Sequence, residues 1–309
     1  MKYLLFVICI CLIGFGCDRT EVPPGTEPVL KIKLQFDPIQ ERLDNLGNPS
    51  IIPAGNAAQT PSFRSMSTHY IELVPNELTQ YKSGQALYSG AEVATSAANP
   101  HSFTTAIDFD NAIVKGENEV FFEIPIKDLA PGTYRHLRVS VSYQNYDVVY
   151  NLVNIPGGLP DLNGESGTIA SFLGYFMRLN DITIRNMSTT VDNDVLQGYW
   201  AFETNLSAPW ENFNQLSSGQ APEGATTVVN PFPTAIPPGS CVVSGDLDNE
   251  LVITGDETAD ISLTLSFSIN NSFEWEDDNG NGQLDLDIGN GTMESVVDMG
   301  LRGLIGIVE

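Results

Sequence analysis

The chain has 309 residues, of which 39 are Asp or Glu and only 14 are Lys or Arg, so its formal net charge is -25. This charge excludes a nucleic-acid-binding protein, because no basic surface is available to neutralise phosphates. A content of 42% hydrophobic residues, with 27 Gly and 19 Pro, indicates a turn-rich, mainly β globular protein.

Residues 1–16 have the pattern of a signal peptide. Lys2 is followed by fourteen uncharged, mostly apolar residues, which are too few to span a bilayer comfortably. The segment ends in Gly16 before Cys17 and resembles the bacterial lipoprotein signal, although Phe15 departs from the small or aliphatic residue usual at its position. The resemblance implies cleavage before Cys17 and acylation of its thiol. The alternative is an ordinary secretory signal with an incidental cysteine.

Residues 17–29 are expected to hold the lipidated cysteine and an extended, proline-rich tether. No other segment approaches eighteen apolar residues, so we expect the lipid to be the only membrane contact. The signal and the acidic residues Asp18 and Glu21 resemble envelope lipoproteins of the Bacteroidota, which implies a lipid anchor in the outer membrane. Arg19 interrupts these acidic residues, so both surface exposure and a periplasmic orientation are open.

Strict alternation of apolar and polar residues predicts half-buried strands over 30–36, 137–143 and 261–269. The first places Leu30, Ile32, Leu34 and Phe36 on one face, and the last has four hydroxyl side chains on its outer face. Further strands are expected near 69–74, 119–124, 146–153, 181–187, 198–204 and 250–254. Many short strands with Gly, Pro, Asn and Asp between them predict a mainly β fold of antiparallel β-sandwich architecture.

One short helix is expected after residue 168. Ile169, Phe172, Leu173, Phe176 and Met177 fall at the spacing of one helical face, although Gly174 lies between them.

Residues 154–167 are rich in Gly, Pro and Asn and are predicted to be a linker. The linker would separate an N-terminal β-sandwich domain of residues 30–153 from a C-terminal acidic β domain of residues 168–309. Residues 241–309 carry 15 acidic side chains and one base, so this part repels itself unless cations bind to it. The alternative is that both halves share one extended sandwich.

The sharpest local motif is an acidic loop, residues 277–288. It resembles the calcium loop of EF-hand and dockerin sequences, with Gly282 at the sharp turn and oxygen-bearing side chains at the spacing that a hard cation needs. The ligands implied by this resemblance are Asp277, Asn279, Asn281, Asp285 and the main-chain carbonyl of Gln283.

The last position of the loop, normally a bidentate Glu, is Ile288. Calcium binding therefore requires a carboxylate from outside the motif, and the candidates are Asp287, Glu294 and Asp298. A solvated Asn-Gly-rich hairpin loop between Trp275 and Leu284 explains the same residues without an ion. A bound calcium ion would be structural rather than catalytic.

Three histidines, His69, His101 and His136, lie in the first half. A softer-metal site from Met66, His69 and His136 is conceivable. The order of an alternating strand, a His-Tyr-Ile strand and a Pro-Gly-Thr-Tyr turn is similar to that of secreted copper-binding sandwiches of the MbnP-like kind, over residues 30–150 at most. Isolated surface histidines are the competing interpretation, and it is favoured.

Catalytic motifs of the common hydrolases, metalloproteases and nucleotide-handling enzymes are absent. A pair of carboxylates for glycan hydrolysis needs no motif and is kept as an alternative. Trp210, which follows a proline, is the aromatic ring expected to be exposed for ligand binding, whereas Trp200 is expected in the core. Cys241 is expected to be a buried small hydrophobe.

Together these patterns predict a lipid-anchored, non-enzymatic protein of the cell envelope that binds an extracellular ligand, either a glycan or a protein. Calcium is its expected structural ion. The alternatives are a periplasmic copper-binding protein and a carboxylate-based glycan hydrolase.

Overall fold

The computed structural model describes residues 27–95, 103–221 and 241–309. The predicted signal peptide, Cys17 and the tether as far as residue 26 lie outside the described residues. The described residues are mainly β, as predicted, with several sheets and no helix of seven or more residues. Among them, no helix is both long and apolar enough to cross a membrane.

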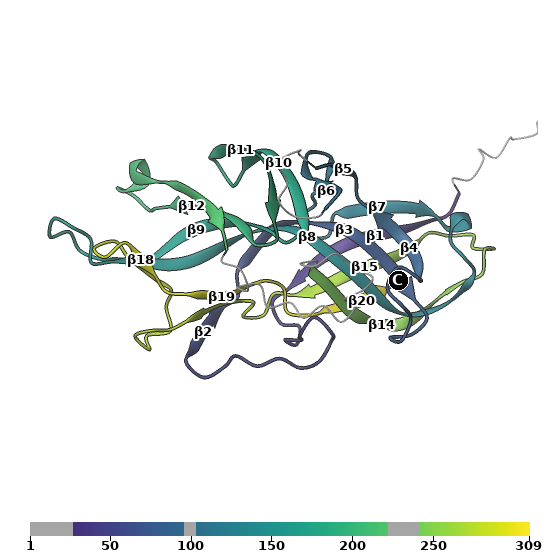
Figure 1. The fold of residues 1–309 in the computed structure, drawn as a ribbon. Helices are drawn as coiled ribbons and strands as arrows, with labels where there is room; N and C mark the ends of the chain where they lie inside the picture. Colours follow the sequence, from purple (N-terminus) through teal and green to yellow (C-terminus); the bar gives the residue numbers. More distant parts are fainter. Residues whose placement is uncertain (1–26, 96–102, 222–240) are drawn as a thin grey trace, which may run out of the picture.

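One strand of 22 residues, β8 (Gly132–Val153), runs through the centre of the molecule and organises the fold (Figure 1). One edge of β8 pairs with β3 (Ser62–Val74). The opposite edge pairs first with β14 (Cys241–Ile253), along residues 132–141, and then with β9 (Leu162–Phe172), along residues 143–152. The sheet therefore forks at Ser142, where one strand leaves and another joins the same edge.

On the β14 side of the fork, two parts of the largest sheet pack around one core. One part contains β14, β8 and β3, with β4 (Gln85–Ser89) at its edge. The other part contains, in spatial order, β20 (Leu304–Val308), β15 (Ile261–Ser268), β1 (Val29–Asp37) and β7 (Val120–Pro125).

Strand β1 confirms the predicted alternation, since its apolar residues are buried in this core and Lys31 and Lys33 are not. Strand β15 does so too on its apolar face, but Ser266 and Ser268 on the hydroxyl face are also buried. Gln40 covers them, because its side chain accepts a hydrogen bond from Ser266 Oγ at 2.7 Å and its carbonyl accepts one from Ser268 Oγ at 3.0 Å.

On the β9 side of the fork, three layers are stacked, and Figure 1 shows the outer two above and below the middle one. The middle layer is β8 and β9 with β12 (Tyr199–Asn205) and β13 (Leu216–Gln220). One outer sheet has the order β11 (Ser188–Leu196), β10 (Phe176–Thr183), β6 (Thr105–Asp108) and β5 (Glu92–Ala94). The other has the order β19 (Val296–Met299), β16 (Phe273–Glu276) and β2 (Asn56–Gln59).

The middle layer is buried on both faces. Because successive strand residues point to opposite faces, Tyr143 and Phe172 enter the core under β10, whereas Tyr146 and Ile169 enter the core under β16. The remaining short elements are β17 (Asp285–Asp287) and β18 (Thr292–Met293), and the 3-10 helices η1 (Phe109–Asn111), η2 (Ile126–Asp128) and η3 (Glu211–Phe213).

The pairing is not entirely antiparallel. Strand β1 runs parallel to β15, and parallel pairs also join β6 to β10, β14 to β20 and β8 to β17. The strand expected at 181–187 is only partly present: residues 181–183 are the end of β10, and residues 184–187 form the turn to β11.

The predicted short helix is wrong. Ile169 and Phe172 belong to β9, and Phe176 and Met177 begin β10 after a turn. The helical spacing arises because β9 is buried on both faces, so its apolar residues do not alternate, and a three-residue turn then precedes the next strand.

The predicted linker, residues 154–167, contains the turn of a β8–β9 hairpin and the first residues of β9. The two predicted halves also share one core, because β1 from the first half is hydrogen-bonded along its length to β15 from the second. The described strands therefore follow the alternative of one extended architecture more closely than a division at the hairpin.

Candidate functional site

The acidic loop connects β16 to β17 and is closed by hydrogen bonds to Asp277. The Asp277 carboxylate accepts the backbone N–H groups of Gly280 at 2.9 Å, Asn281 at 3.1 Å and Gly282 at 2.9 Å. Gly280 and Gly282 have φ angles of +72° and +71°, a conformation that favours glycine. The tight turn expected at Gly282 is therefore present.

Asp285 lies at the centre of the loop and is only 7% exposed. Its Oδ2 accepts the side-chain amides of Asn279 at 2.7 Å and Asn281 at 2.8 Å, and its Oδ1 accepts that of Asn151 at 2.8 Å. The structure thus brings together three of the side chains expected as calcium ligands, Asn279, Asn281 and Asp285. The Gln283 carbonyl accepts the Trp275 indole N–H at 3.2 Å.

Of the three carboxylates considered as the missing ligand, Glu294 folds back onto the loop. It accepts the backbone N–H of Asp285 at 2.8 Å and that of Asp278 at 3.1 Å. Burial, and then the charges of Asp285 and Asp277, raise the pKa of Glu294. Asp287 instead binds Asn154 and Asn290, and Asp298 pairs with Arg302.

Glu294 and Asp285 therefore place negative charge beside the loop, and no cationic side chain of the described residues forms an ion pair with either of them. Among the described residues, no three His, Cys, Asp or Glu side chains form a group that could hold a metal ion. Calcium ligation here would need the oxygens of Asn279 and Asn281, which requires their amides to rotate away from Asp285.

A second candidate site lies at the fork of the large sheet. A cavity of about 310 Å³, here named the fork pocket, opens where β14 and β9 separate along β8. Its lining includes Leu173, Tyr199, Trp200, Cys241 and Val243, together with residues 296–302 and 44–46. Residues 222–240, which join two lining residues, Ala221 and Cys241, lie outside the described residues.

The fork pocket has an aromatic wall on β12. Trp200 is half-buried and its ring lies against Gly219 of β13, where an added Cβ would come within 3.3 Å of the ring. Tyr199 is also a lining residue, but its ring points to the other face of β12, where it lies 5.8 Å from Phe172 between ring centroids and its hydroxyl donates to Ser218 Oγ at 3.1 Å. Cys241 is buried, as expected, and burial raises the pKa of its thiol to about 12, so it is a lining group and not a nucleophile.

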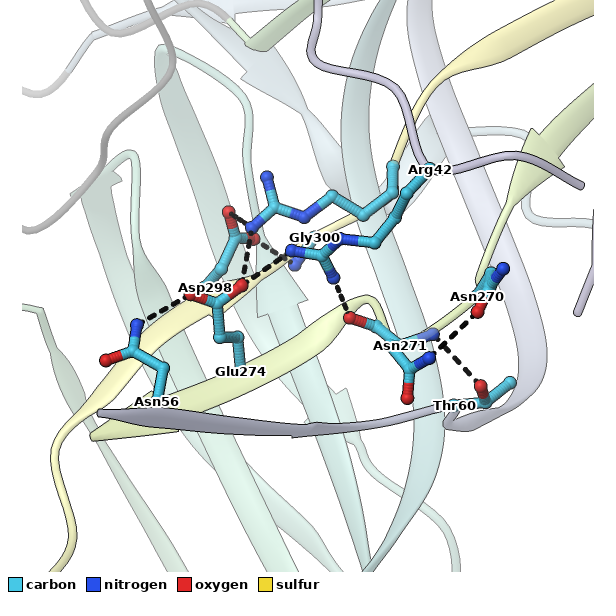
Figure 2. Close-up of polar contacts among 9 residues, drawn as sticks. Arg42, Asn56, Thr60, Asn270, Asn271, Glu274, Asp298 and Gly300 are labelled. Carbon is cyan, nitrogen blue, oxygen red and sulfur yellow. Dashed lines mark hydrogen bonds and ion pairs between the residues drawn. The ribbon is translucent and has the colours of Figure 1, made fainter. Parts of the chain in front are cut away.

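Two lining residues of the fork pocket, Asp298 and Arg302, belong to an ion network with the buried residues Arg42 and Glu274. Glu274 Oε2 accepts Arg42 at 2.6 Å and Arg302 at 3.4 Å, and Arg302 also pairs with Asp298 at 2.5 Å. Figure 2 shows Asn56 on the other oxygen of Glu274, at 2.7 Å, and Arg42 donating to the carbonyl of Asn271.

The ion network attaches the loop after β1 to the turn before β20. The backbone repeats this connection, since Leu43 N–H donates to Arg302 O at 2.9 Å. The same loop is also attached to β14, because Ser244 N–H donates to Asn45 O at 2.9 Å. The charges balance as two cations and two anions, so the pocket has a rigid, locally neutral rim.

The residues of the proposed copper site do not converge. In the pairing of β3 with β8, His136 lies opposite Val74. Val74 is five residues further along β3 than His69, so His69 and His136 are roughly 16 Å apart along the sheet. Met66 is fully buried in the largest core. His136 lies beside Asp246, and His101 lies outside the described residues.

His69 is instead a buried link between two sheets. Its side chain is 8% exposed, and its Nε2 lies 3.1 Å from Glu92 Oε1, which also accepts the Tyr175 hydroxyl at 3.2 Å. Its Nδ1 has no hydrogen-bond partner among the described residues. Burial lowers the pKa of His69 below its usual value of 6.5, although Glu92 opposes the shift.

Acidification is therefore expected to destabilise the protein through His69. Below about pH 6.5 the unfolded chain binds a proton at this position more readily than the folded protein does. The free energy of unfolding therefore decreases as the pH is lowered. We expect the urea midpoint to fall less between about pH 7.5 and about pH 5.5 in His69→Gln than in the wild type. His136→Gln is the control, and an equal reduction in its pH dependence would contradict this role for His69.

Trp210 is not the free ring that the sequence predicts. It is partly buried against the core under β16, and the exposed ring beside it is Phe213, at 5.9 Å between ring centroids. Trp200, expected in the core, lines the fork pocket. The only local signal for Trp200 is its place beside Tyr199 at the start of a strand, which does not tell a core ring from a pocket ring.

Comparison with protein-family models, with curated proteins and with solved structures finds no match to this chain.

Proposed function

We propose that this protein is a lipid-anchored, non-enzymatic β-sandwich protein of the outer membrane that binds an extracellular ligand in the fork pocket. The observation that carries the proposal is this cavity of about 310 Å³, with Trp200 on one wall. Cavities of this size with aromatic walls and a few polar groups are the usual form of small-ligand sites. A glycan unit fits such a volume better than a protein surface does.

The construction of the pocket supports ligand binding. Its polar rim is held by the buried ion network and by backbone hydrogen bonds between the loop after β1, β14 and the turn before β20. A site that is already ordered loses little conformational entropy when a ligand binds. Trp200 offers a flat apolar surface of the kind that stacks on the apolar face of a sugar ring.

Calcium is the structural ion of this proposal. Asp277, Asn279, Asn281 and Asp285 would ligate it, with the Gln283 carbonyl and with Glu294 in place of the missing loop carboxylate. The supporting observations are the buried position of Asp285 and the return of Glu294 to the loop. An ion here would neutralise carboxylates that repel one another.

The geometry favours neither alternative function. Copper binding lacks converging ligands, because His69 and His136 lie apart on the sheet. For glycan hydrolysis, the carboxylates lining the fork pocket are Asp44 and Asp298. Asp44 accepts the N–H groups of Leu46 and Asn48, and Asp298 pairs with Arg302, so both are engaged in building the rim.

The fork pocket is tested by truncating its aromatic wall. In Trp200→Ala, affinity for soluble oligosaccharides, screened by isothermal titration calorimetry, is expected to fall about tenfold or more, because removing a central aromatic contact costs about 2 kcal/mol. Trp210→Ala is the matched control, since Trp210 packs in another core. Oligosaccharide binding that survives Trp200→Ala, or that is lost equally in Trp210→Ala, would contradict the assignment.

A further inference from the structure

A second cavity lies on the opposite face of the same strands. Ser171 lines the fork pocket, and its neighbour Phe172, which points to the other side, lines a cavity of about 390 Å³. We name it the arginine cavity, because Arg64 from β3 and Arg185 from the turn between β10 and β11 both line it. The two cavities have no lining residue in common.

The two guanidinium groups share one carboxylate oxygen. Arg64 Nη1 and Arg185 Nη1 each lie 3.5 Å from Asp147 Oδ2. The other oxygen, Oδ1, accepts the Thr168 hydroxyl at 2.5 Å. Within the described ranges, neither guanidinium group donates a hydrogen bond of 3.5 Å or less with suitable angles, so the N–H groups of both remain available.

Two arginines paired with a single carboxylate, Asp147, are unusual in the described part of the chain. Arg135 has its own carboxylate, Glu250, and Arg138 has Glu72. Arg178 has two, Asp192 and Asp194, and the ion network balances two arginines with two carboxylates. In the described ranges, Asp147 is the one carboxylate within ion-pair distance of the Arg64 or Arg185 guanidinium group. The buried carboxylate of Glu203 lies nearby, but it accepts the backbone N–H groups of Arg185 and Asn186 and not the guanidinium.

The arginines are accessible at the mouth of the cavity. The side chain of Arg64 is 41% exposed and that of Arg185 is 33% exposed, whereas Asp147 is 21% exposed. An anion arriving from solvent therefore meets both guanidinium groups, and a planar carboxylate matches the paired N–H groups that each presents.

The walls behind the arginines are aromatic. Phe109, Tyr143 and Phe172 form a cluster with ring centroids 4.9 to 5.1 Å apart, and all three line the cavity. Burial raises the pKa of Tyr143 to about 12, so its phenol stays neutral and repels no anion. Asn145 donates its amide to Ile184 O at 2.9 Å, which fixes the turn that carries Arg185.

We propose that the arginine cavity binds a small organic carboxylate, whose oxygens bridge Arg64 and Arg185 while its ring lies against Phe109, the least buried ring of the aromatic cluster. Asp147 occupies the anion position in the free protein and competes with the ligand. The carboxylate can belong to an aromatic acid or to an acidic sugar, since both carry this group on a six-membered ring that has an apolar face.

The test measures binding of benzoate, glucuronate and neutral benzyl alcohol to the purified full chain by isothermal titration calorimetry. Benzoate or glucuronate is expected to bind more tightly than benzyl alcohol. Arg64→Gln and Arg185→Gln should each weaken carboxylate binding about tenfold, the loss expected for a hydrogen bond to a charged group. Arg135→Gln, on a surface pair with Glu250, is the matched control and should leave binding unchanged.

Asp147→Asn tests the proposal in the opposite direction, by an increase in carboxylate affinity. It removes the competing charge and keeps an acceptor for Thr168, so carboxylate affinity should rise, in the direction opposite to the arginine variants. Tighter binding of benzoate indicates an aromatic acid, and tighter binding of glucuronate indicates an acidic glycan. The proposal is overturned if neither acid binds better than benzyl alcohol, or if the two arginine variants bind as the wild type does while retaining its thermal unfolding transition.

Discussion

Replacing Glu274 with glutamine is expected to lower the free energy of unfolding by about 3 to 5 kcal/mol, because the change leaves the buried Arg42 without its counter-charge, whereas Arg302 keeps Asp298. Glu274 is 3% exposed, and one of its oxygens accepts both Arg42 and Arg302. Arg42 is itself nearly buried, and burial lowers the pKa of its guanidinium, which shows how costly its charge is without Glu274. Urea unfolding followed by far-ultraviolet circular dichroism measures the loss.

The matched control for Glu274→Gln is Glu276→Gln on the same strand. Glu276 is exposed and has no ion pair among the described residues, so its replacement should change the free energy of unfolding by about 0.5 kcal/mol or less. Equal effects of the two substitutions would show that the ion network adds nothing beyond an ordinary surface charge. Because this network forms one rim of the fork pocket, Glu274→Gln should also weaken ligand binding there.

Calcium is expected to raise the free energy of unfolding by about 2.7 kcal/mol when its free concentration is about a hundred times the dissociation constant. The reason is that the folded acidic loop places Glu294, Asp285 and the side chains of Asn279 and Asn281 beside one another, whereas the unfolded chain does not. Thermal or urea unfolding with calcium and with excess chelator measures the difference. Magnesium should stabilise less, because it requires a smaller, near-octahedral site.

Two substitutions identify the loop as the source of this effect. Asp285→Asn and Glu294→Gln should each remove most of the calcium-dependent stabilisation. Asp287→Asn is the control, because Asp287 binds Asn154 and Asn290 outside the loop centre. A calcium effect that is absent from the wild type, or that persists in both loop variants, would reduce residues 277–288 to a solvated turn.

The two cavities are placed by the same structural event. Strand β8 continues through the fork at Ser142 while its partner on one edge changes from β14 to β9. The Ser142 carbonyl accepts the N–H groups of Leu173 and Gly174, which turns the chain away from β14 after β9. Beside the fork, adjacent residues of β9 line cavities on opposite faces, so two ligands could be held about one strand without sharing contacts.

Local sequence determined the strands that are buried on one face and the loop whose contacts lie within a few residues. Strand β1 shows its alternation because its two faces have different surroundings. The acidic loop is likewise readable, since Asp277 binds backbone groups only three to five residues further along the chain. The return of Glu294 was among the alternatives because it too is close in sequence.

Tertiary structure alone decided the rest. The false helix at Ile169 to Met177 arose because a strand buried on both faces shows no alternation, and burial on both faces depends on sheets formed by distant segments. Arg42 and Glu274 are 232 residues apart, and Arg64 meets Arg185 only because β3 and β10 lie against the same part of β8 and β9. Contacts over such separations depend on strand order and register, which short-range patterns of residues do not encode.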